Sequence, residues 1–260
     1  MNKMTKGTVI CAAVLAALSV TAGRTMSFFT ATDTKTNVFT LGDLDIGLNE
    51  PEWDPTPGDN KTPDGSNMYP GYTVYKNPTV RNITSDRNGN EPCYMRVRVH
   101  IVDHQDAPVT DEETLELIRQ MIYYDASYNG TYEQKGEAKY LTEGRIPGYS
   151  LEELASFPTV NPVFELDEMR STPSVPVYAY KGPDGDGILD CGEEAVLFST
   201  VAVPTDWTQQ ELSRIGDFRL VITAEAVQCS GFEDREEAYE ALDGEIASGK
   251  LQEIAEGSDD

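Results

Sequence analysis

The stretch Tyr94-Met-Arg-Val-Arg-Val-His-Ile101 decides the fold class, because apolar and polar residues alternate along it without a break. Successive side chains of a β-strand point to opposite faces. The four apolar residues would therefore lie on one face of an extended chain, and the arginines and the histidine on the other. We predict a half-buried β-strand over residues 94–102.

Four further segments have the composition of strands. They are rich in β-branched and apolar residues and cover residues 44–48, 175–181, 195–203 and 218–227. Turn-forming stretches separate them, and residues 50–70 hold five prolines among Gly, Asp and Asn, which predicts a loop. This pattern favours a mostly-β fold, namely an antiparallel β-sandwich of the jelly-roll-like kind with short helical insertions.

Three segments have the pattern of a capping box, in which a Ser or Thr and a Glu three residues later satisfy the free amides of a helix start. They are Thr110-Asp-Glu-Glu113, Ser150-Leu-Glu-Glu153 and Thr208-Gln-Gln-Glu211. The first two make residues 103–174 a predicted helical insertion in a domain that spans 28–232. Apolar residues at roughly helical spacing predict a helix over about 234–255 in the acidic tail, residues 233–260.

The first 27 residues have the organisation of an export signal. Lys3 and Lys6 precede the apolar run Thr8–Val20, and small residues follow it before Phe28. The run is shorter than the roughly 20 residues that a membrane-spanning helix needs. We expect a secreted protein, located in the extracellular matrix or at the cell surface, with no stable membrane anchor after processing. The alternative is a retained anchor.

The charge excludes one class of partner. The chain has 20 Lys and Arg against 45 Asp and Glu, for a net charge of −25. Such a surface repels nucleic acids and anionic lipid. We therefore expect no nucleic-acid partner.

Three cysteines remain once Cys11 is removed with the signal. An odd number allows at most one intramolecular disulfide. Cys93 opens one predicted strand and Cys229 follows another, so the two thiols would approach each other if these strands are antiparallel neighbours. Cys93 and Cys229 are therefore the candidate disulfide pair, and three reduced cysteines are the alternative. The spacing of Cys93, Cys191 and Cys229 fits no zinc motif.

The two histidines do not predict a catalytic site. On a straight strand His100 and His104 would lie about 13 Å apart, whereas ligands of one zinc ion both lie about 2 Å from it. The chain has no His-Glu-x-x-His and no Gly-x-Ser-x-Gly motif. We expect both histidines to be solvent-facing and the protein not to be an enzyme.

One acidic segment has the chemistry of a calcium loop. Four carboxylates fall at positions 3, 5, 9 and 12 of an EF-hand-type loop, with Gly187 at its turn position; they are Asp184, Asp186, Asp190 and Glu193. Position 1 is Gly182 instead of aspartate, and no predicted helices flank the loop. A hairpin turn is the alternative, because Asp-Gly pairs favour turns with or without a metal. Calcium is the one candidate cofactor.

Four segments together resemble the TasA/camelysin group of exported bacterial proteins. They cover residues 28–48 (FFTATDTKTNVFTLGDLDIGL), 71–82 (GYTVYKNPTVRN), 196–205 (VLFSTVAVPT) and 218–228 (FRLVITAEAVQ). The resemblance implies a SipW-type signal peptide, cut by a dedicated signal peptidase. It also implies a secreted β-sandwich that builds fibres in the biofilm matrix, with other matrix proteins as further partners. Some relatives are described instead as metallopeptidases.

The resemblance suggests assembly by strand donation. The freed segment Phe28–Leu41 would add to an open sheet edge of the next subunit, where backbone hydrogen bonds supply affinity. The apolar residues of this assembly strand are Phe28, Phe29, Val38, Phe39 and Leu41. Such a contact does not close on itself and propagates as a filament. The alternatives are a camelysin-type secreted metallopeptidase and a calcium-binding adhesion module.

Overall fold

The computed structural model describes residues 37–41, 46–49, 68–84, 91–126, 132–135, 138–141, 148–248 and 254–255. In these parts the chain is mostly β, with a few short helices between the strands. The predicted mostly-β fold with antiparallel sheets is therefore confirmed, and so is the acidic C-terminal helix. The jelly-roll-like sandwich remains a prediction.

The strands and helices follow one another along the chain with these bounds. The strands are β1 (Asn37–Leu41), β2 (Ile46–Asn49), β3 (Thr73–Tyr75), β4 (Thr79–Asn82), β5 (Cys93–Asp103), β6 (Ile122–Tyr123), β7 (Tyr132–Lys135), β8 (Ala138–Leu141), β9 (Phe164–Leu166), β10 (Val177–Tyr180), β11 (Ile188–Leu189), β12 (Glu194–Val196), β13 (Thr200–Ala202), β14 (Phe218–Gln228) and β15 (Ile254–Ala255). The helices are α2 (Glu112–Gln120), α3 (Leu151–Leu154), α4 (Gln209–Ile215) and α5 (Arg235–Ala247).

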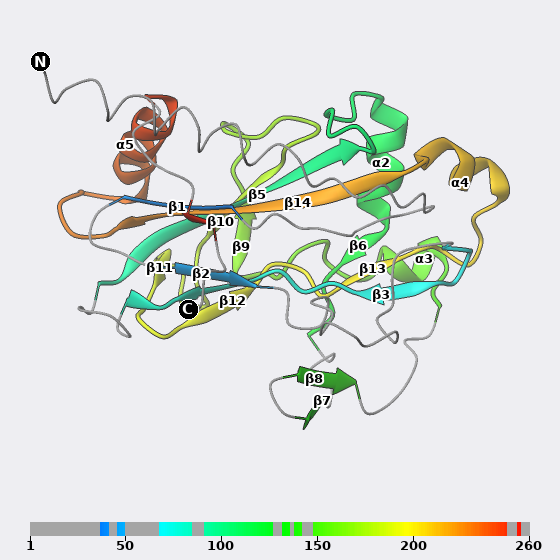
Figure 1. The fold of residues 1–260 in the computed structure, drawn as a ribbon, viewed down its shortest axis with the longest axis horizontal. Coiled ribbons are helices and arrows are strands. Elements are labelled where there is room, and N and C mark those ends of the chain that lie inside the picture. The colour runs from blue at the N-terminus through cyan, green and yellow to red at the C-terminus, as the bar shows by residue number, and fades with distance from the viewer. Residues whose placement is uncertain are drawn as a thin grey trace, which may run out of the picture.

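The largest sheet has the strand order β15-β1-β14-β5-β10-β9, and β11 also pairs with β5 (Figure 1). Its centre is the antiparallel pair β5 and β14, in register from Cys93 opposite Gln228 to Asp103 opposite Phe218. The prediction of an antiparallel sheet is wrong for one pair, because β1 runs parallel to β14. These two strands are far apart in the sequence, so no hairpin forces them to be antiparallel.

The main core lies between the large sheet and two three-stranded sheets, β12-β4-β2 and β3-β13-β6 (Figure 1). The apolar half of the alternating stretch faces this core, as predicted. Its residues are Met95, Val97, Val99 and Ile101, each at most 3% exposed. Leu48, Val80, Phe198 and Val201 belong to the same buried cluster and come from the small sheets and the segment that joins them.

The predicted strand over 195–203 is two strands in different sheets. β12 pairs with β4, and β13 pairs with β3 and β6. Between them Leu197 and Phe198 are completely buried. A continuous apolar run has no periodicity that would reveal such a crossing from one sheet to another.

The region predicted as a helical insertion contributes to the core. Leu115 and Ile118 of α2 are buried in it, and β9 joins the large sheet. The first predicted cap is wrong by one residue, because Asp111 instead of Thr110 caps α2 and accepts a hydrogen bond from the Thr114 amide at 2.9 Å. The capping boxes that begin at Ser150 and Thr208 are confirmed.

Helix α5 covers the opposite, outer face of the large sheet (Figure 1). Its residues Ala238, Tyr239 and Leu242 form a second buried cluster with Ala179 and Val227 of the sheet. The helix ends earlier than predicted, with Ser248 as its C-cap. Residues 254–255, predicted to be helical, form β15 and pair with β1.

Candidate assembly site

The two long edges of β14 have different partners. On one edge β5 pairs with β14 along its whole length. On the other edge β1 covers only Thr223–Val227. No strand in the described ranges covers Arg219–Ile222 on that side.

The structure places part of the predicted assembly strand at this edge, within the same subunit. Val38, Phe39 and Leu41 belong to β1, opposite Ala224, Glu225 and Val227 of β14, respectively. Five residues of this edge are therefore occupied by the chain's own β1. Phe28 and Phe29 lie outside the described residues.

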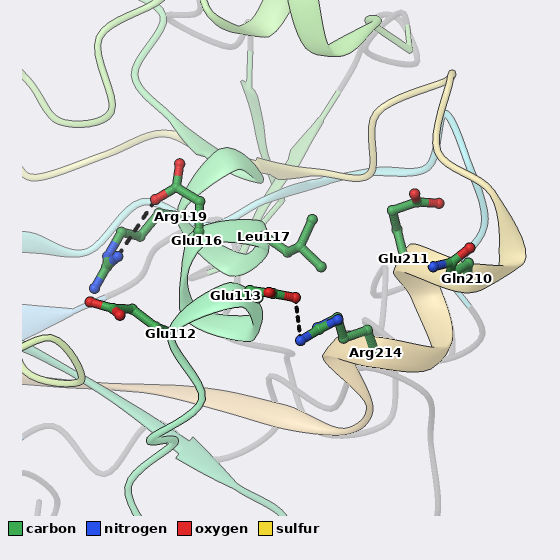
Figure 2. A pocket seen from close by; sticks show the side chains of 8 residues that line it. All are labelled: Glu112, Glu113, Glu116, Leu117, Arg119, Gln210, Glu211 and Arg214. Atoms are coloured by element: carbon green, nitrogen blue, oxygen red, sulfur yellow. Dashed lines mark ion pairs between the residues drawn. The ribbon is translucent and has the colours of Figure 1, made fainter.

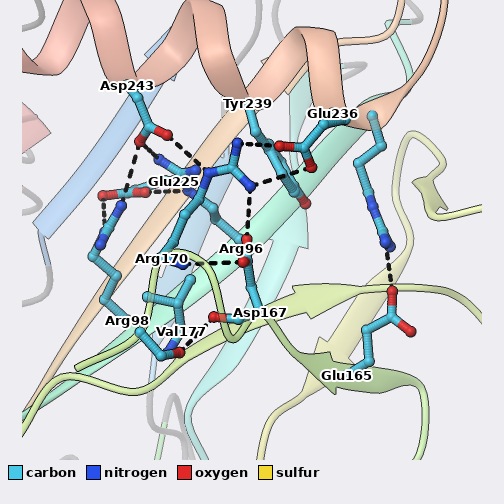
Figure 3. Close-up of polar contacts among 12 residues, drawn as sticks. Arg96, Arg98, Glu165, Asp167, Arg170, Val177, Glu225, Glu236, Tyr239 and Asp243 are labelled. Carbon is cyan, nitrogen blue, oxygen red and sulfur yellow. Dashed lines mark hydrogen bonds and ion pairs between the residues drawn. The ribbon is translucent and has the colours of Figure 1, made fainter. Parts of the chain in front are cut away.

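A charged cluster lies on the outer face behind this edge (Figure 3). Glu225 is 2% exposed, and its carboxylate accepts hydrogen bonds from Arg96 Nε at 2.5 Å and Arg98 Nε at 2.6 Å. Arg96 and Glu225 are direct cross-strand neighbours, the arrangement in which opposite charges stabilise a strand pair. This pair fixes β5 and β14 in register.

Arg96 connects the sheet to helix α5. Its side chain is completely buried, and its second nitrogen, Nη2, donates to Asp243 of the helix. Its guanidinium carbon lies 4.9 Å from the centre of the Tyr239 ring, a cation–π geometry. The Tyr239 hydroxyl donates to the Met95 carbonyl at 2.7 Å.

A second arginine, Arg170, also binds helix α5. Arg170, in the loop after β9, donates to Asp243 at 2.8 Å, to Asp167 at 3.0 Å and to Glu236 at 2.6 Å. Burial alone would raise the pKa of Asp243, but hydrogen bonds from Arg96 and Arg170 lower that pKa below its ordinary value. Asp243 is therefore held as a carboxylate between two guanidinium groups.

Sequence reasoning missed this cluster. A half-buried strand predicts that its polar half faces solvent, whereas Arg96 is completely buried and His100 is partly buried, 3.3 Å from the Thr223 hydroxyl. The signal that could have revealed it is the tail helix, whose apolar residues require a face to cover. His104 is exposed in the turn after β5, so the two histidines do not share a site.

The acidic segment at 182–194 is a turn in which two of the four predicted calcium ligands, Asp186 and Glu193, accept hydrogen bonds. Gly182, Gly185 and Gly187 have φ angles of 70°, 83° and 75°, which glycine adopts readily. Glu193 accepts from the Tyr180 hydroxyl at 2.7 Å and from the Asp190 amide at 3.0 Å. No group of three or more His, Cys, Asp or Glu suited to a metal ion occurs in the described part of the chain.

Of the remaining predicted calcium ligands, Asp186 supports the turn and Asp190 is exposed. Asp186 Oδ1 accepts from the Ile188 amide at 3.1 Å. Asp184 is exposed. Calcium binding by this segment stays a prediction.

The predicted disulfide is not formed in the structure. Cys93, Cys191 and Cys229 are free thiols. The residue opposite Cys93 is Gln228, and Cys229 lies one position beyond the end of β14. Burial raises the pKa of the Cys229 thiol to about 12.

An open groove of about 580 Å³ lies between α2 and α4 (Figure 2). Its lining is largely acidic and includes the ion pairs Arg119–Glu116, at 3.6 Å, and Arg214–Glu113. Leu117 supplies an apolar wall. The lining contains no cysteine, serine or histidine.

These observations define a mostly-β protein with a short parallel strand, β1, beside β14 of its main sheet. No protein-family model matches the chain, and neither a curated protein nor a solved structure matches it. Within the described ranges, no helix is both long and apolar enough to span a membrane.

Proposed function

We propose that this chain is a secreted subunit of an extracellular fibre, and that subunits join by exchange of β1. The observation that carries the proposal is the outer edge of β14. A five-residue strand near the start of the mature chain covers half of that edge in parallel, and the other half has no strand partner in the described residues.

The exchange of β1 breaks and forms the same kind of strand pair. In the single subunit β1 bonds to its own β14, and in a fibre β1 would bond to the same edge of a neighbouring β14. Because the backbone hydrogen bonds are the same in both states, the exchange has a low cost, as in domain swapping. The contact joins two different surfaces and does not close, so it propagates as a filament.

In the observed register, a donated segment longer than β1 could pair with more of β14. Asn37 lies opposite Thr223, and each residue of β1 advances one residue along β14. Continuing the register backwards sets residues 33–36 opposite Arg219–Ile222. A donor that reaches from Phe28 to Leu41 is thus long enough to cover the rest of the acceptor edge.

The acceptor strand β14 is held in place by its contacts with β5. The Arg96–Glu225 pair and the full-length pairing of β5 with β14 hold the strand in one register. A rigid acceptor loses little conformational entropy when a strand adds to it.

The proposal is tested by electron microscopy of the mature protein, residues 28–260, beside the variant Val38→Asp/Phe39→Asp. Two charges in β1 are expected to abolish filaments, while circular dichroism shows that the domain remains folded. The matched control is Gln209→Glu/Gln210→Glu, which adds the same charge on α4 and is expected to assemble normally. Intact filaments from the β1 variant would contradict strand donation.

A further inference from the structure

The C-terminal segment contacts the same strand that the proposed assembly needs to release. β15 pairs antiparallel with Asn37 and Val38 on the outer edge of β1. Helix α5 packs across β14, β5 and β1 (Figure 1). A β1 strand that leaves its own sheet therefore has to separate from β14, from β15 and from the helix above it.

We propose that α5 and β15 form a clamp that holds β1 in its own subunit and limits assembly. This inference rests on the proposed function, since a clamp on β1 regulates assembly only if β1 is the donated strand. Release of α5 from the sheet is the controlling step, and the free form of the C-terminal segment is the assembly-competent one.

The attachment of α5 depends strongly on charge. The helix buries only three side chains, those of Ala238, Tyr239 and Leu242. Its polar anchor is Asp243, which faces Arg96 and Arg170 together, with Arg98 Nη2 at 3.5 Å (Figure 3).

Two further ion pairs hold the start of the helix. Glu236 binds Arg170 at 2.6 Å, and Arg235 binds Glu165 of β9. Two carboxylates of α5, those of Asp243 and Glu236, therefore both bind Arg170 in the loop after β9.

The loss of Asp243 would affect more than one contact. Arg96 is completely buried, and without Asp243 its Nη2 nitrogen loses the carboxylate to which it donates. Arg96 then keeps only Glu225 as a partner. A buried guanidinium nitrogen without an acceptor is costly, so the structure can relieve that cost by letting the helix lift and water reach the arginine. Such local opening, at lower free energy than global unfolding, is the behaviour expected of a terminal element.

The clamp is tested by amide hydrogen exchange of β1 in the full mature protein. In Asp243→Asn, exchange at residues 37–41 is expected to rise about tenfold together with exchange in α5, because both open in one step. Filament growth, followed by light scattering, is expected to start earlier. The control is Glu240→Gln, which makes the same charge change at an exposed site of the same helix, and which should leave both measurements at the wild-type level.

A second variant covers the case in which Asp243→Asn unfolds the domain. Glu236→Gln keeps Asp243 in place and removes one partner of Arg170. It should raise β1 exchange by a smaller factor without lowering the helix and sheet content measured by circular dichroism.

The outcomes separate the two proposals. Faster exchange in α5 with unchanged exchange in β1 would overturn the clamp, and filaments of the wild-type protein would still support strand donation. Faster exchange in both segments, with no filaments from any variant, would keep the contact between α5 and β1 and overturn the proposed function.

Discussion

The two faces of the β5–β14 pair are both covered, but by opposite chemistry. The inner face presents Val97, Ile222 and Ala224 to an apolar core shared with the small sheets. The outer face presents Arg96 and Glu225 to helix α5, with both side chains nearly inaccessible to water.

The two faces are therefore expected to respond differently to substitutions. Apolar packing is non-directional, so a small loss of volume on the inner face costs a proportionate amount. A buried ion pair is directional, and removal of one partner leaves the other charge without compensation. The inner face stabilises the fold, and the outer face determines which strand and which helix meet.

The largest effect is expected from Glu225→Ala on the outer face. Loss of this carboxylate removes the acceptor of both Nε groups and leaves Asp243 as the remaining carboxylate of Arg96 and Arg98. We expect the free energy of unfolding to fall by about 3 kcal/mol, the lower end for breaking a buried ion pair. Urea denaturation followed by circular dichroism measures the loss.

The double variant Arg96→Met/Glu225→Leu is the control for that prediction. It removes both charges and keeps the volume, so it should be far less destabilising than Glu225→Ala alone. If the two variants lost the same stability, packing rather than charge would explain the outer face, and the contrast between the faces would disappear.

A smaller effect is expected from Ile222→Val on the inner face. Ile222 is completely buried, and the deletion of one buried methylene costs about 0.5–1.5 kcal/mol. Thermal or urea unfolding tests this, and hydrogen exchange in α5 should not change. A loss as large as that of Glu225→Ala would show that the inner face is as intolerant as the outer one.

The smallest effect is expected from the pH dependence of His100 on the outer face. Burial and the nearby Arg98 lower the pKa of this histidine below its ordinary value of 6.5, although Glu225 opposes the change. The unfolded chain therefore binds the proton more readily, so this part of the stability is complete above pH 6.5 and is lost as the pH falls towards the lowered pKa.

The variant His100→Gln should remove that part of the acid sensitivity, seen as a smaller loss of unfolding free energy between about pH 7.5 and pH 5.5. His104→Gln, at an exposed position, serves as the comparison variant. Identical pH profiles for wild type and His100→Gln would contradict the assignment.

The sequence predicts the inner face well and the outer face poorly, for a physical reason. Alternation shows which residues of β5 are apolar, and Met95, Val97 and Val99 are buried accordingly. It cannot show that a distant helix covers the polar residues, because the contact between Arg96 and Asp243 joins positions 147 residues apart. The direction of β1 could not be predicted either, since no turn links it to β14.

The candidate assembly site is predictable in part. Val38, Phe39 and Leu41 are readable as a strand, and the structure places them at a sheet edge. Their partner strand and the presence of β15 on the other side of β1 depend on long-range pairing, which local sequence patterns do not encode.

The most direct measurement is a cross-link between β1 of one subunit and β14 of another. Val38→Cys and Ala224→Cys are introduced in separate chains, each with Cys191→Ser and Cys229→Ser, and one chain carries a nitrogen-15 label. Residues 38 and 224 are register partners, and adjacent strands lie about 4.8 Å apart, within the span of a disulfide. After mixed assembly and mild oxidation, strand exchange predicts a disulfide that joins a labelled to an unlabelled chain in the filaments. Filaments in which residues 38 and 224 link only when one chain carries both cysteines would contradict it.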